Sequence, residues 1–227
     1  MPNLEMPKTT KAFQFFTRLH LAELTGLKAR NLQELLSHVK TVPDSVIYYH
    51  THDFLEEHQY LLLEPPNGFA YWATTALNEI ELGEKLASIN NGEFSTLRTL
   101  RDKIAETIEK FLEKRKEPLR EANEGREFHF LKSISFVLPT PYTAHSLEEF
   151  IVALKKVTIH SIYFHMFEAR LRLEKGTNDF SLWLEGELEE KELAKKITKF
   201  DPYNLTGEGV RTKIIRLAEA RLKETRQ

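Results

Sequence analysis

Residues 47–50 read IYYH and residues 67–72 read NGFAYW, and both stretches recur later in the chain. The second versions are IYFH at residues 162–165 and NDFSLW at residues 178–183. The only two tryptophans of the protein, Trp72 and Trp183, are the last residues of NGFAYW and NDFSLW, so they occupy equivalent positions. A match of this kind at a fixed offset is the signature of an internal repeat.

The match extends outward from these stretches over most of the chain. An offset of 115 residues, set by Phe13 and Phe128, holds without a gap through the two repeated histidines. It falls to 111 residues at Asn67 and Asn178. We expect the two copies to form one compact pseudo-symmetric domain. The predicted division of the chain is an N-terminal tail, a first copy, a charged linker and a second copy (1–12, 13–112, 113–127 and 128–224).

Composition excludes several classes of protein. The 227 residues are 41% hydrophobic and 29% charged, with a net charge of −2 and no cysteine. This composition is typical of a soluble globular chain and excludes disulfides, cysteine-ligated zinc and iron–sulfur clusters. No apolar run approaches the roughly 20 residues of a membrane helix, and the N-terminus lacks a signal-peptide core. We therefore expect a cytoplasmic protein without a membrane partner, and the acidic balance argues against nucleic acid.

Each copy opens with a predicted strand. Residues 128–138, FHFLKSISFVL, place apolar side chains at alternate positions with Lys132 as the exception, which is the period of a strand with one buried face. Residues 12–21, AFQFFTRLHL, have a similar aromatic and apolar composition. Gly26, Pro139 and Pro141 are expected to end these strands. A lone strand needs a partner for its backbone groups, so we expect the two strands to pair antiparallel about a pseudo-twofold axis.

Helices follow each strand. Asn31 and Ser146 precede apolar stripes at helical spacing, as N-caps do. The IYYH and IYFH segments have strand-like residues, but the continuation HMFEARLRL favours a helix. Asn67 and Asn178 are expected to cap short helices that carry Phe and Trp on one side. Further helices are predicted over 81–89, 97–112, 192–200 and 210–222. The predicted fold class is α+β and mostly helical.

The residues that recur in both copies are the candidates for ligand binding. A buried histidine bound to backbone groups, and a tryptophan in a core, would also recur for structural reasons alone. A seam between the copies would be a natural site for a small molecule or a protein partner. The candidates are Tyr48, His50, Trp72, Tyr163, His165 and Trp183.

A histidine-rich stretch in the first copy, HTHDFLEEH at residues 50–58, is the only hint of a metal site. His50, His52 and His58 lie near carboxylates, as the ligands of a divalent metal do. The second copy has Phe167 and Leu173 in place of the last two histidines, which favours packing positions over ligands. No metal, cofactor or catalytic residue is therefore assigned.

No nucleotide-binding, hydrolase or metalloprotease motif is present. The leading hypothesis is a non-enzymatic binding or regulatory protein. A metal-dependent enzyme with a His/carboxylate site in the first copy is the alternative. The oligomeric state and the identity of any ligand stay open.

The repeated pattern resembles an uncharacterised bacterial family of unknown function, along nearly the whole chain. The resemblance rests on Ile-Tyr-Tyr/Phe-His, on Asn-x-Phe-x-x-Trp and on the Glu-x-Glu-Leu-x-x-Lys that follows. The first copy departs from the pattern with Gly68 where the second has Asp179, and with a longer loop. The resemblance implies relatives beside sugar-transfer enzymes, and hence a metabolic setting. The resemblance assigns no activity, so no catalytic role is carried over.

Overall fold

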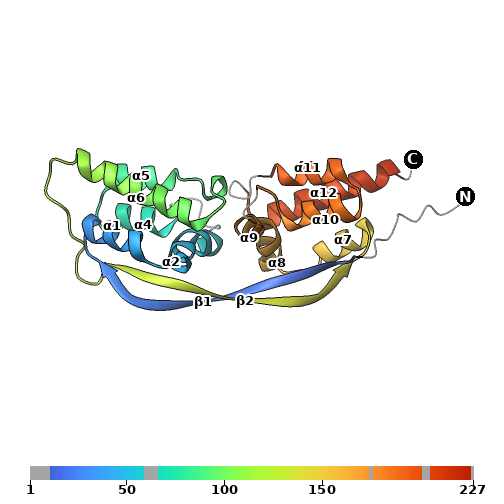
Figure 1. The fold of residues 1–227 in the computed structure, drawn as a ribbon, viewed down its shortest axis with the longest axis horizontal. Helices are drawn as coiled ribbons and strands as arrows, with labels where there is room; N and C mark the ends of the chain where they lie inside the picture. Colours follow the sequence, from blue (N-terminus) through green and yellow to red (C-terminus); the bar gives the residue numbers. More distant parts are fainter. Residues whose placement is uncertain (1–10, 59–65, 174–175, 201–204, 226–227) are drawn as a thin grey trace, which may run out of the picture. The chain divides into compact units, whose positions relative to one another are not determined.

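The computed structural model describes residues 11–58, 66–173, 176–200 and 205–225. Two strands, β1 (Phe13–Ala29) and β2 (Phe128–Ala144), pair with each other in a two-stranded sheet (Figure 1). The strands are antiparallel and each is followed by helices. The predicted fold class and strand pairing are therefore confirmed.

Both strands run further than the sequence predicts. β1 passes through Gly26, whose φ of 81° only glycine adopts at no steric cost, and β2 passes through Pro139 and Pro141. The prediction that these residues end the strands is wrong. Both strands of a two-stranded sheet are edge strands, so a proline that lacks an N–H is tolerated there. The predicted buried face is also shorter, because Phe136 and Leu138 are about half exposed, at 49% and 43%.

The described chain forms two compact units, and each unit contains part of both strands. The first-copy unit comprises residues 20–135 and the second-copy unit comprises residues up to 19 together with those from 136 onward. The start of each strand therefore belongs to the unit formed by the other copy's helices, and we call these segments the exchanged strands. Phe13 and Phe15 lie in the core formed by the second copy's helices, and Phe128 and Phe130 lie in the core formed by the first copy's helices.

In the first-copy unit the helices lie on one side of their part of the strand pair (Figure 1). Two contacts dominate the packing, between α1 and α6 and between α4 and α5. The elements are α1 (Leu32–Thr41), α2 (Asp44–Tyr48), η1 (Tyr49–Asp53), α3 (Phe54–His58), α4 (Gly68–Thr75), α5 (Ile80–Ala87), η2 (Asn91–Glu93) and α6 (Leu97–Lys114).

The second-copy unit repeats this order of elements, except that its described residues contain no counterpart of η2. Its main helix contacts are α10 with α11 and α7 with α12. The elements are α7 (Leu147–Leu154), α8 (Ile159–Tyr163), η3 (Phe164–Glu168), α9 (Ala169–Leu173), α10 (Asp179–Glu187), α11 (Lys191–Thr198) and α12 (Gly207–Thr225).

Capping interactions begin the first helix of each unit as predicted. The Asn31 side chain accepts the Glu34 N–H at 3.0 Å, and Ser146 accepts the Glu149 N–H at 3.2 Å. Both glutamates reach back to a preceding backbone N–H, that of Arg30 in the first unit. This arrangement resembles a capping box, except that each glutamate accepts from the residue before the N-cap, and the cap side chain satisfies an N–H that the helix start leaves open.

The IYYH and IYFH segments are helical, as predicted, but each contains a turn of π-helix. η1 continues α2 and leads into α3, while η3 continues α8 and leads into α9. The two π segments occupy equivalent positions, Tyr49–Asp53 and Phe164–Glu168. A π turn widens the helix locally and is frequent at functional sites. In both units it carries the recurring histidine.

Candidate functional site

His50 and His165 occupy equivalent positions and hold the start of the exchanged strand. His50 Nε2 accepts the Leu131 N–H at 3.1 Å, and His165 Nε2 accepts the Phe16 N–H at 2.9 Å. An imidazole that accepts at Nε2 is neutral and carries its proton on Nδ1. The Nε2 lone pair of each ring is therefore already used within its unit.

Burial favours this neutral form. It lowers the pKa of His50 from the ordinary 6.5 to about 3. Burial also lowers the pKa of His165, although hydrogen bonding and attraction to Asp179 oppose the change. Both rings are thus uncharged near neutral pH.

The two histidines differ at their other nitrogen. His165 Nδ1 lies 2.7 Å from Asp179 Oδ2, which also accepts a hydrogen bond of 2.7 Å from Arg172 Nη2. In the first copy Gly68 stands at the aspartate's position, and a Cβ there would lie 3.0 Å from His50 Nδ1. At this position, the first residue after the capping asparagine, only the second copy therefore has a charged side chain.

Asp179 is ionised in this arrangement. Burial acts to raise its pKa, but the hydrogen bonds from His165 and Arg172 outweigh burial and lower it. Asp179 is the first residue of α10, where the helix dipole also favours a negative charge. The result is a fixed carboxylate with a guanidinium beside it.

These groups line a cavity of about 580 Å³, here called the Arg172 pocket, which belongs entirely to the second-copy unit. That volume is within the range of small-molecule sites, and most of the wall is apolar. Residues from both sequence copies contribute to it. The lining is Lys11, Ala12, Phe13, Gln14, Phe16, Val137, Phe164, His165, Arg172, Asp179, Leu182, Trp183 and Glu187.

The equivalent region of the first-copy unit has different residues at three positions. Phe54 lies 3.5 Å from the position of a Cβ on Gly68, and its ring centre is 6.0 Å from that of Tyr71. The second copy has Ala169 at the position of Phe54. Glu57 stands where the second copy has Arg172. The first copy thus combines glycine with a bulky ring, and the second combines aspartate with alanine.

Both tryptophans are buried, and each hydrogen-bonds to the backbone just before an exchanged strand. Trp72 Nε1 donates to the Arg126 carbonyl at 2.7 Å, and Trp183 Nε1 donates to the Lys11 carbonyl at 3.0 Å. Trp183 also forms part of the wall of the Arg172 pocket.

The predicted tyrosines stack on the ring four residues further along the helix. Tyr48 lies on His52 with ring centres 4.9 Å apart, and Tyr163 lies on Phe167 at 4.4 Å. Neither tyrosine is among the residues that line the Arg172 pocket. The structure therefore brings His165 and Trp183 together at one cavity and places the other four candidates elsewhere.

The other polar residues that recur have structural partners. Asn67 and Asn178 cap α4 and α10 through their side-chain oxygens, as predicted. Glu79 pairs with Arg115 at 2.7 Å, with both side chains at least nine-tenths buried. The same pairing joins Glu190 to the more exposed Arg221 at 2.7 Å.

Within the described residues, no group of three or more histidine, aspartate or glutamate side chains could hold a metal ion. His52 Nδ1 lies 2.9 Å from Thr51 Oγ1. The side chain of His58 falls outside the described residues, so its predicted role stays untested.

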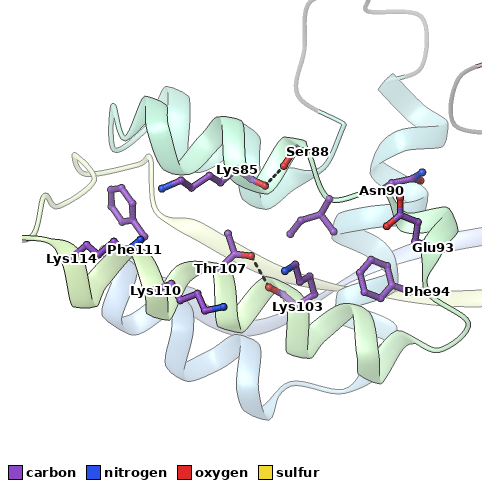
Figure 2. Close-up of a pocket in the computed structure, with 11 residues that line it drawn as sticks. Lys85, Ser88, Asn90, Glu93, Phe94, Lys103, Thr107, Lys110, Phe111 and Lys114 are labelled. Atoms are coloured by element: carbon purple, nitrogen blue, oxygen red, sulfur yellow. Dashed lines mark hydrogen bonds between the residues drawn. The ribbon is translucent and has the colours of Figure 1, made fainter.

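A second cavity, of about 330 Å³, lies between α5 and α6 of the first-copy unit (Figure 2). Four lysines line it, and three of them pair with carboxylates, those of Glu81 and Glu106. All four cations are on the helix surface, where such pairs contribute little and stay solvated. The lining has no counterpart to the buried His165–Asp179 pair. The four lysines are Lys85, Lys103, Lys110 and Lys114.

Sequence reasoning found His165 and Trp183 but did not propose Arg172 or Asp179 as site residues. The available signal was a difference between the copies, glycine against aspartate at positions 68 and 179. A search for what recurs passes over residues that only one copy carries.

Among the helices that the structure describes, none combines the length and apolarity that a membrane span needs. No curated protein matches the chain. The fold is similar to that of OrfY from Thermoproteus tenax, with a TM-score of 0.80 and 26% sequence identity over 94% of this chain and 97% of that one. A model of a family of unknown function, DUF5752, matches residues 10–219. The predicted membership is confirmed, whereas its restriction to bacteria stays a prediction. The chain belongs to the family of unknown function DUF5752.

Proposed function

We propose that this protein is a binding protein whose ligand, a small and largely apolar molecule, occupies the Arg172 pocket. The observation that carries the proposal is the difference between two copies of one unit. Both copies keep the same buried histidine, tryptophan and cap, but among the described residues only the second adds an Arg–Asp pair, and this pair lines a cavity of about 580 Å³. Structural needs alone are met by both copies, so the additional groups point to ligand binding.

The residues in the pocket favour binding over acid–base catalysis. A general base near neutral pH needs an accessible lone pair and a pKa close to 7. His165 uses Nε2 to accept a backbone N–H and directs Nδ1 to Asp179, and burial lowers its pKa. Asp179 is held ionised by two donors. These groups orient a ligand without transferring a proton.

Calorimetric titration of the whole chain with a panel of small apolar molecules tests the proposal. Leu182→Asp places a charge in the pocket wall at a side chain that is 42% exposed, so folding should tolerate it. Tyr71→Asp is the matched control, because Tyr71 is the equivalent residue of the first copy and is 39% exposed. We expect Leu182→Asp to weaken binding at least tenfold and Tyr71→Asp to leave the affinity unchanged. The proposal fails when no member of the panel binds or when both variants behave alike.

A further inference from the structure

Resting on the proposed function, we propose that the ligand of the Arg172 pocket is a free α-amino acid with an apolar or aromatic side chain. Three observations support this class. The polar wall presents a donor and an acceptor side by side, the ionisable lining residues balance in charge, and the remaining wall is apolar.

Arg172 and Asp179 provide the adjacent donor and acceptor. A guanidinium has five N–H donors, and Arg172 gives one of them to Asp179 Oδ2 at 2.7 Å. Both hydrogen bonds to Asp179 fall on Oδ2, and within the described part of the chain none reaches Oδ1. The pair can therefore bind a carboxylate at Arg172 and an ammonium at Asp179 Oδ1. An α-amino acid carries those two groups on one carbon atom.

The guanidinium is held in place for this role. Its central carbon lies 4.7 Å from the centre of the Phe164 ring, a cation–π distance. Asp179 is in turn oriented by the buried His165. A guanidinium held by Phe164 and Asp179 can bind a carboxylate through two parallel hydrogen bonds.

The ionisable lining residues favour a ligand with no net charge. Lys11 and Arg172 supply two positive charges, and Asp179 and Glu187 supply two negative charges. A phosphate or other multivalent anion would meet the Asp179 carboxylate, and a simple amine would meet the Arg172 guanidinium. A zwitterion complements both charges at once.

The apolar wall matches the side chain of such a ligand. Phe13 and Trp183 are each 7% exposed and form a rigid aromatic surface with ring centres 5.5 Å apart. Leu182 and Val137, both about half exposed, also line the pocket. Aromatic and aliphatic rings pack well against such a surface.

Calorimetric titration with three matched probes separates the contributions. L-phenylalanine has both charged groups, 3-phenylpropionate lacks the ammonium, and phenethylamine lacks the carboxylate. We expect wild-type protein to bind L-phenylalanine or L-leucine at least tenfold more tightly than either phenyl analogue. Asp179→Asn keeps the size of the side chain and its ability to accept from His165. It should remove the preference for L-phenylalanine over 3-phenylpropionate.

The variant Arg172→Gln should remove the preference over phenethylamine instead. Glu57→Gln, at the equivalent position of the first copy, should change neither preference. When apolar probes bind but amino acids bind no more tightly than the analogues, the amino-acid inference is wrong and the proposed function stands. When nothing binds, both are wrong.

Discussion

The Nδ1 atom of His165 lies 2.7 Å from the carboxylate of Asp179, a contact that its equivalent, His50, cannot make because Gly68 has no side chain. The other nitrogen of both rings accepts a backbone N–H from an exchanged strand. The Nε2 atom therefore has the same structural role in both copies, whereas the Nδ1 atom contacts a carboxylate at this position only in the second copy.

Removal of this carboxylate should destabilise the protein through His165. In Asp179→Ala the buried Nδ1–H loses its acceptor, and an unsatisfied buried donor costs about 1–3 kcal/mol. Asp179→Asn retains an acceptor oxygen and should cost less. Urea unfolding of the three proteins measures the difference. Equal midpoints for wild type and Asp179→Ala would show that water replaces the bond without cost.

Phenylalanines of the exchanged strands should stabilise the helices of the opposite copy. Phe15 and Phe130 are both fully buried, and removing a buried phenylalanine side chain costs about 3–5 kcal/mol. Phe15→Ala should speed amide exchange in α7 and α10, because Phe15 packs on Phe150 and Phe180. Phe130→Ala should speed it in α1, whose His38 ring lies 5.1 Å from Phe130. Hydrogen exchange read by mass spectrometry locates the effect, and faster exchange confined to the helices of the same copy would contradict the exchange of strands.

Stability should fall on acidification below the ordinary pKa of histidine. The pKa of His50 is about 3 in the folded protein and 6.5 in the unfolded chain, so only the unfolded chain takes up this proton between those values. The stability is fully present above pH 6.5 and is lost toward pH 3. One proton corresponds to a slope of about 1.4 kcal/mol per pH unit. His50→Gln should reduce the slope by that amount, as urea unfolding between pH 5 and 6 would show, and an unchanged slope would mean that the ring is accessible to protons when folded.

Replacing either tryptophan by phenylalanine should cost similar stability but have different effects on binding. Each substitution removes the indole N–H and with it a part-buried hydrogen bond to the carbonyl of Arg126 or Lys11, at about 0.5–1.5 kcal/mol. Only Trp183 lines the Arg172 pocket. Thermal unfolding together with titration of the apolar panel distinguishes the two roles, and weaker binding in Trp72→Phe would place the ligand elsewhere.

Repetition made much of the fold predictable. The caps at Asn31 and Ser146, the paired strands and the helices after them all follow from periodicity and from residue types that both copies share. The sequence does not predict that Phe15 and Phe130 each pack in the core of the other copy. Alternation shows that one face of a strand is buried, but it does not show which copy's helices cover that face.

The π turns and the pocket were missed for related reasons. A π turn of five residues, such as Tyr49–Asp53, hardly disturbs the apolar spacing of the helix around it. The Arg172 pocket is lined by Arg172 and Asp179, side chains that only one copy has. Such substitutions are visible in the sequence, but their effect on space depends on contacts between distant segments.

The exchanged strands have a consequence for how a chain of this kind can arise. A polypeptide with a single copy would leave its helices without the phenylalanines that complete their core, and would need a second molecule to supply them. Its folding would then depend on concentration, as in an obligate homodimer. Joining two copies through the segment between α6 and β2 makes that association intramolecular and gives each half a permanent, high effective concentration of the other. Once both halves are always present in one chain, a mutation in one of them no longer appears twice, which is the condition under which a single Arg172–Asp179 pair can arise.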